Sequence, residues 1–120
     1  MAQGVGSATQ VRNSRDTLGK TLLGCVDYKG SASYVQGGDA IDVKPFGIHN
    51  TLLSLIGSID QTDKWMAVGL PVNSDVTAWR LVWISLTTAT VGGQAQTAGQ
   101  EAAAGTNLST FIVRLAALGY

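Results

Sequence analysis

The sequence predicts an all-β protein: a single-domain antiparallel β-sandwich, jelly-roll-like in arrangement, with an extended N-terminal arm. Short runs of aliphatic, β-branched and aromatic residues recur along the chain, and turn-forming residues separate them. No segment shows the 3.6-residue periodicity of a convincing amphipathic helix. A length of 120 residues suits one domain with one hydrophobic core.

Residues 1–17 are expected to form the arm. They hold almost no large apolar side chains and are rich in Gly, Ser, Thr, Gln and Asn, a composition that cannot bury enough surface to fold by itself. An arm of this kind is expected to become ordered against a neighbour, which makes Arg12 and Arg15 candidate interface residues. The β-sandwich domain is then expected to span residues 18–120.

A strand is predicted at residues 22–28, followed by a structural corner. Gly37 and Gly38 can adopt the positive φ angles that a turn between two short strands requires. Asp39 is expected to cap or solvate this turn. In the short strand that follows, at residues 40–43, Asp42 is expected to face solvent, opposite its apolar neighbours.

Residues 51–87 predict a three-stranded antiparallel meander. Aromatic and β-branched runs there are separated by a polar turn at residues 60–63 and by a second turn at residues 73–75. Residues 88–107 are rich in Gly, Ala, Gln and Thr and predict no definite element. The last strand, within residues 108–118, is apolar on both faces, which is typical of a central strand covered on both sides.

Composition and charge limit the partners. Charged residues make up 13% of the chain, against about 25% in a typical soluble domain, which indicates a surface largely covered by partners. The net charge is zero and no basic cluster is present, so binding to nucleic acid is not expected. No apolar stretch is long enough for a membrane span or resembles a signal peptide, so no membrane partner is expected and synthesis in a cytoplasm is predicted.

No catalytic, cofactor or metal site is predicted, and the protein is expected not to be an enzyme. Asp39, Asp42 and His49 lie close together in the sequence, but their spacing fits no ligand or triad pattern. The turn at residues 60–63 carries too few ligands for a calcium loop. Cys25 is the one cysteine and is expected to be a small buried hydrophobic residue.

Three tryptophans form the remaining candidate group. Trp65, Trp79 and Trp83 fall on two neighbouring predicted strands, and the last two share a strand face. They suit a core, a subunit interface or a platform on which a ligand stacks. We retain them as candidate interface residues.

The order of several short motifs resembles a known family. A Tyr-x-x-Gly-Gly turn at residues 34–38 is followed by a Phe-Gly-Ile corner at residues 46–48. Near the end, Gly-Thr-Asn-Leu-Ser begins at residue 105, and Val-Arg-x-x-Ala-x-Gly closes the chain at residue 119. Together these motifs resemble the head decoration, or cement, proteins of tailed bacteriophages over roughly residues 28–119.

The resemblance implies a β-sandwich or jelly-roll-like module without catalytic activity. Such a module would sit on the outside of an icosahedral phage head and bind the major capsid protein, stabilising contacts between capsid subunits. It would also bind itself, with a trimer favoured and a dimer possible. The alternatives are another virion component, such as a tail or head-fibre base protein, and a carbohydrate-binding module built on the tryptophans.

Overall fold

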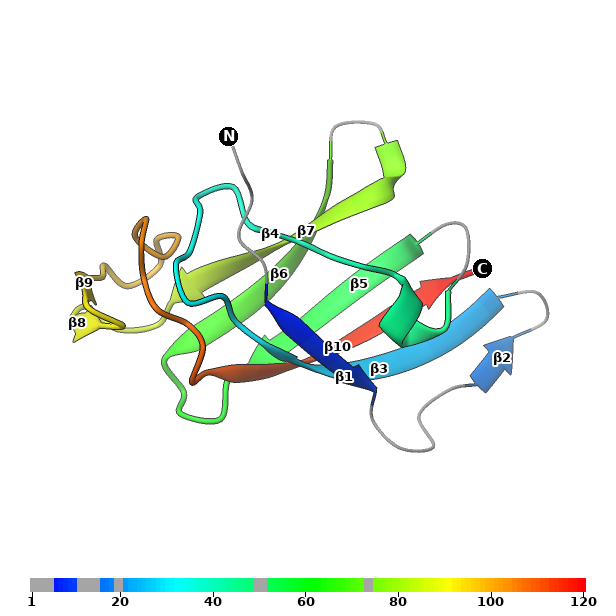
Figure 1. Ribbon diagram of the computed structural model, residues 1–120, viewed down its shortest axis with the longest axis horizontal. Helices are drawn as coiled ribbons and strands as arrows, with labels where there is room; N and C mark the ends of the chain where they lie inside the picture. The colour runs from blue at the N-terminus through cyan, green and yellow to red at the C-terminus, as the bar shows by residue number, and fades with distance from the viewer. Residues whose placement is uncertain (1–5, 11–15, 19–20, 49–51, 73–74) are drawn as a thin grey trace.

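Eight strands form one curled antiparallel sheet that makes up most of the structure (Figure 1). The structure is a computed structural model and describes residues 6–10, 16–18, 21–48, 52–72 and 75–120. It confirms the predicted all-β, single-domain, antiparallel class and is consistent with a β-sandwich. The strands of the main sheet are β1 (Ser7–Gln10), β2 (Asp16–Leu18), β3 (Thr21–Lys29), β4 (Asp39–Ala40), β5 (Leu52–Ile59), β6 (Trp65–Val72), β7 (Asp75–Ser85) and β10 (Ile112–Gly119).

The strand order is β1-β3-β10-β5-β6-β7-β4, with β2 also paired to β3. The predicted meander is confirmed, because β5, β6 and β7 are antiparallel neighbours. The predicted last strand is β10, and it lies centrally between β3 and β5. Sequence-adjacent runs therefore pair with each other, whereas β10 pairs with strands far away in the chain.

Described parts of the predicted arm belong to the sheet. β1 pairs with residues 26–29 and β2 pairs with residues 21–23, both on β3. Because β10 occupies the other side of β3, β1 and β2 follow one another along the same edge. The structure thus places these residues in the sheet and not in a free extension, while a domain boundary at residue 17 stays a prediction.

The core lies on the concave side of the curled sheet. In β10 the buried residues are Val113, Leu115 and Ala117, and the intervening ones point to the outer side. The prediction that this strand is covered on both faces is therefore wrong for the single chain, since Ile112 is 39% exposed. Cys25 also differs from its prediction: it alternates to the outer side of β3 and is only partly buried.

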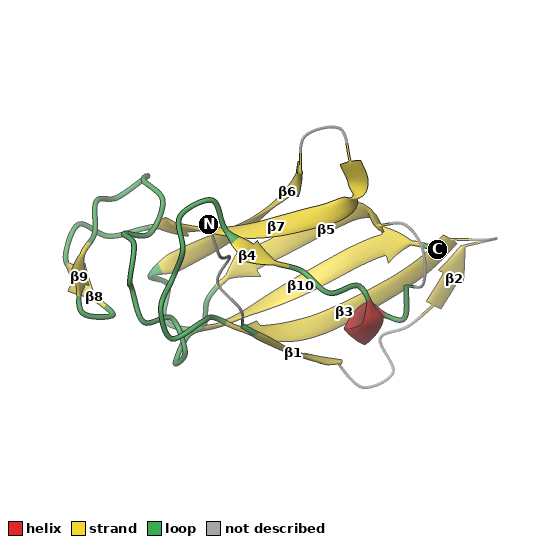
Figure 2. Ribbon diagram, turned by 45° about the horizontal axis from the view of Figure 1, so that its top comes forward, coloured by secondary structure: helices red, strands yellow, loops and turns green. Residues whose placement is uncertain are grey.

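The segment at residues 88–107 is more ordered than its composition suggests. It contains a short hairpin, β8 (Thr90–Val91) with β9 (Gln94–Ala95), at the end of the molecule away from β2 (Figure 2). Buried Gln96 holds the segment together: its amide nitrogen donates to Thr106 Oγ1 at 2.8 Å, and its amide oxygen accepts from Ala103 N.

A single turn of 3-10 helix, η1 (Lys44–Phe46), packs against β3. The approach is close: a Cβ atom at Gly24 would lie 2.3 Å from the Phe46 carbonyl oxygen. A glycine is therefore required on β3 where η1 lies against it. In the part of the chain that the structure describes, no helix has the length and apolar character of a membrane-spanning one.

Candidate functional site

The Gly37-Gly38 corner is a turn, as predicted. The φ angles are 102° at Gly37 and 107° at Gly38, and Gly38 N donates to Val35 O. The prediction for Asp39 is wrong, because its side chain neither caps the turn nor faces solvent. Asp39 is 0% exposed and begins β4. The predicted exposure of Asp42 is confirmed.

Asp39 belongs to a polar chain that connects β3, β4 and the residue before β1. The Tyr28 hydroxyl donates to Asp39 Oδ2 at 3.0 Å and accepts a hydrogen bond from Gly6 N at 3.0 Å. The chain thus joins the residue before β1 to β3 and β4. Burial raises the pKa of Asp39, and the Tyr28 hydroxyl, with Trp83 and Ser31 nearby, offsets only part of that rise. Among the described residues, no partner accepts from Trp83 Nε1 or bonds Asp39 Oδ1.

A second polar contact connects the corner to the long segment before β10. The Tyr34 hydroxyl donates to Glu101 Oε2, which also accepts from Gly37 N at 2.7 Å. Burial raises the pKa of the Tyr34 hydroxyl, and the hydrogen bond to Glu101 adds to the rise. Both carboxyl groups therefore accept hydrogen bonds from tyrosine hydroxyls, and these hydrogen bonds connect segments that are far apart in the sequence.

Replacing Asp39 with asparagine is expected to change the pH dependence of stability. Because burial raises the folded-state pKa above 3.8, the folded protein keeps this proton at pH values where the unfolded chain has lost it. The free energy of unfolding of the native protein should therefore fall as the pH rises from about 4 through the folded-state pKa. The Asp39→Asn variant should lack this fall.

Urea unfolding at a series of pH values from about 4 upward measures the difference in slope. The exposed residue Asp42 provides the matched control, since Asp42→Asn should keep the native slope. Parallel pH profiles for the native protein and Asp39→Asn would contradict the assignment of the slope to this buried carboxyl.

Two of the three tryptophans, Trp65 and Trp83, lie in the core and not at the predicted interface. Trp65 and Trp83 are 0% exposed, and their ring centroids lie 6.4 Å apart in an edge-to-face arrangement within the core. Trp79 is partly buried, and its Nε1 donates to Leu52 O at 2.9 Å. Even spacing placed Trp79 and Trp83 on the same face correctly, but that face is the inner one. The structure therefore also removes the basis for a ligand-stacking platform at Trp65 and Trp83.

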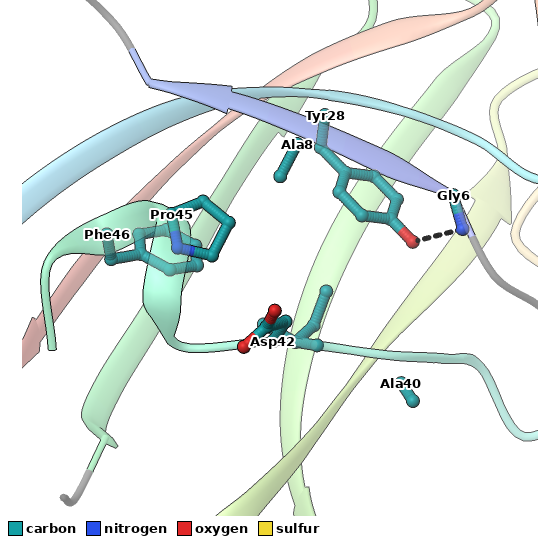
Figure 3. Close-up of a pocket in the computed structure, with 8 residues that line it drawn as sticks. Gly6, Ala8, Tyr28, Ala40, Asp42, Pro45 and Phe46 are labelled. Carbon is teal, nitrogen blue, oxygen red and sulfur yellow. Dashed lines mark hydrogen bonds between the residues drawn. The ribbon is translucent and has the colours of Figure 1, made fainter. Parts of the chain in front are cut away.

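A cavity of about 210 Å³ lies where the two edges of the sheet approach each other (Figure 3). Gly6 and Ala8 border it from the β1 side, and Asp42 and Phe46 border it from the segment after β4. In Figure 3 the Tyr28 ring lies on the side of Ala8 and Gly6, with its hydroxyl turned toward Gly6. Asp42 accepts a hydrogen bond from Lys44 N. The cavity can hold a small apolar group, but its polar groups are engaged in holding the backbone.

The outer face of the sheet carries most of the exposed large hydrophobic residues among those that the structure describes. Six of the eight exposed large hydrophobic residues lie on three adjacent strands, β10, β5 and β6. Ile56, at the middle of β5, is 64% exposed. The six are Leu53, Ile56, Ile59, Met66, Leu70 and Ile112. Exposed apolar patches of this kind mark interaction sites in soluble proteins.

The other candidate residues from the sequence either lie away from this face or are not among the residues that the structure describes. Arg12, Arg15 and His49 lie outside the described residues. Asp60 is buried, and its carboxylate accepts backbone hydrogen bonds at the β5–β6 turn. No group of three His, Cys, Asp or Glu side chains that could hold a metal ion is found in the described ranges.

Comparisons of the chain with protein-family models, with curated proteins and with solved structures found no match. The sequence predicted the apolar outer side of β10 but not that of β5 and β6. The signal was the presence of aliphatic residues at both alternating positions of 52–59 and 112–118, where a sheet with one solvated face would place polar side chains.

Proposed function

We propose that this chain is a non-enzymatic structural protein of a tailed-phage virion, which binds the outside of the head and stabilises contacts between major capsid subunits. The observation that carries the proposal is the apolar outer face of β10, β5 and β6. β5 and β6, at its centre, contain no charged residue. When a protein partner covers a face of this composition, the free energy falls, because apolar surface is removed from water.

The motifs at residues 34–38, 46–48 and 105–119 support the choice of partner through their resemblance to head decoration proteins. A low charged fraction fits a protein that works inside an assembly. Many copies on one particle would gain avidity, because each engaged copy raises the effective concentration of the next contact. Self-association belongs to the same proposal.

The protein is expected to be found on phage heads. Particles are purified from the culture that makes the protein and labelled with gold-conjugated antibody raised against the full chain. We expect gold over most heads and none over tails. Labelled tails would replace the proposal with that of a tail or fibre-base component. Unlabelled particles, with the protein detected in the same lysate, would overturn a virion role.

A further inference from the structure

We propose that the outer face of β10, β5 and β6 pairs with the same face of a second copy of this chain, with Ile56 at the centre of the contact. The inference rests on the same outer face as the proposed function and names the first partner that covers it. Three observations carry it: a continuous row of apolar residues across five strands, the placement of charge around that row, and the size of the face.

The row follows from the strand registers. Ala116 lies opposite Cys25 on one side and opposite Ile56 on the other. Ile56 in turn lies opposite Val68, which lies opposite Val82. Paired residues point to the same side of a sheet, so these side chains form one cross-strand row on the outer face. Its accessible part runs from β3 to β6, because Val82 on β7 is buried. Ile56 stands at its midpoint and is the most exposed member.

Neighbouring rows extend the apolar area. Met66 lies opposite Ile59 and Ile84, and Leu118 lies opposite Leu23. Aliphatic side chains of this size interdigitate when two sheets stack about 10 Å apart. The outer residues of β10 and β5 are thus of the kind expected for a strand covered on both sides, although the single chain covers only one.

The two central strands of the face, β5 and β6, carry no charge, and the charged residues lie on the strands around them. Arg114 on β10 forms an ion pair with Asp27 on β3 at 2.8 Å, toward one end of the face. Lys29 and Arg80 lie on β3 and β7. In a twofold contact the central residues meet their own copies, so a charge there would repel itself; β5 and β6 carry none. This placement favours a second copy of the chain over a partner that needs charge complementarity.

The size of the face approaches what a stable dimer needs, since side chains add accessible surface to the projected area. Four strands, β3, β10, β5 and β6, at about 4.8 Å spacing, with eight residues at about 3.3 Å each, span roughly 500 Å² in projection. Stable protein interfaces bury about 800 Å² of accessible surface per partner. Figure 1, viewed down the shortest axis of a molecule that measures 45 × 29 × 21 Å, shows β3, β10, β5 and β6 spread side by side as a broad surface. Contact between two such faces is twofold, so it favours the dimer over the trimer.

The experiment measures the mass of the purified full chain in the absence of phage particles, by sedimentation over a range of concentrations. We expect a species of twice the 12.5 kDa chain mass. The dissociation constant of the dimer should be roughly 30-fold higher, or more, for the Ile56→Asp variant than for the native protein, which is the effect expected of a residue at the centre of an interface. The control, Ala104→Asp, adds the same charge at an exposed position in the segment before β10 and should leave the dimer unchanged.

A second measurement keeps the test valid if Ile56→Asp affects folding. In a Cys25→Ala background, Ile56→Cys should form a covalent dimer with a short thiol-specific cross-linker, because a twofold axis at the centre of the face brings position 56 close to its own copy. Ala104→Cys in the same background should not. A native chain that stays monomeric, or cross-linking no greater at position 56 than at 104, would overturn the inference.

Failure of this inference and failure of the proposed function give different results. A monomeric protein whose binding to phage heads is lost in Ile56→Asp would show that the capsid, and not a second copy, covers the face. A dimer that never labels phage particles would retain the self-association and remove the virion role.

Discussion

Replacing Trp83 with alanine is expected to cost about 3–5 kcal/mol of folding free energy, among the largest single-residue effects in this domain. Trp83 is 0% exposed and contacts two other aromatic rings: Trp65, and Tyr28 at a centroid distance of 6.5 Å. Alanine would leave a cavity between β6, β7 and β3 that these rigid rings cannot fill. Since typical domains are stable by about 5–15 kcal/mol, much of the variant could unfold at physiological temperature.

The polar part of the indole makes a second comparison useful. Among the described residues Trp83 Nε1 has no hydrogen-bond partner of good geometry, although the Asp39 carboxyl lies near it, so this buried donor is poorly satisfied in the native protein. Trp83→Phe removes that donor and keeps most of the ring, and it should cost clearly less than Trp83→Ala. Urea unfolding followed by circular dichroism at a fixed protein concentration measures both.

Tyr120 provides the control for loss of an aromatic side chain. It is 48% exposed at the end of the chain, and Tyr120→Ala should cost less than about 1 kcal/mol. Equal losses at positions 83 and 120 would contradict a core built around Trp83.

The meander and the central last strand could be predicted because their signals are local. Runs of strand-forming residues around the turns at residues 60–63 and 73–75 indicate neighbouring antiparallel strands, and β10 was recognised by its apolar length. What could not be predicted is which face of each strand the core would occupy. In β5 and β10 both faces are aliphatic, so alternation carries no information about the inner side.

The misassigned residues depend on contacts between distant segments. Turn chemistry near Gly38 suggested a capping role for Asp39, but the curl of the sheet brings Tyr28 from β3 against it. Likewise, β1 is a short polar segment with little strand signal of its own, and β3 supplies the edge on which it pairs. The candidate interface was misplaced for the same reason: tryptophans are common at interfaces, but the inner face of β6 and β7 buries two of these three.

Asp60→Ala is expected to be the most damaging substitution of a charged residue. One carboxylate oxygen accepts from Lys64 N at 2.7 Å and Trp65 N at 2.9 Å, and the other accepts from Thr62 N at 2.9 Å. Thr62 and Lys64 are exposed, so water can replace the carboxylate there, but Trp65 N is buried and would be left unpaired. We expect a loss of about 2–4 kcal/mol at neutral pH.

The loss should shrink in acid. Burial by itself would raise the pKa of Asp60, but the hydrogen bonds from Thr62, Trp65 and Lys64 together outweigh it, and the net pKa lies below 3.8. A lowered folded-state pKa stabilises the protein above the unfolded-state value, and this stabilisation disappears as the pH falls through the folded-state pKa. The difference between native protein and Asp60→Ala should therefore be full at pH values above about 5 and smaller near pH 3.

Asp63→Asn is the matched control, because Asp63 lies in the same turn with φ at 59°, a conformation that asparagine also accepts. It should change the free energy of unfolding by less than about 0.5 kcal/mol at either pH. Chemical denaturation of the three proteins at two pH values is sufficient. If the loss of stability in Asp60→Ala did not depend on pH, the prediction would be contradicted. The effect would then come from contacts that the uncharged side chain also makes, and not from the charge of the carboxylate in the turn between β5 and β6.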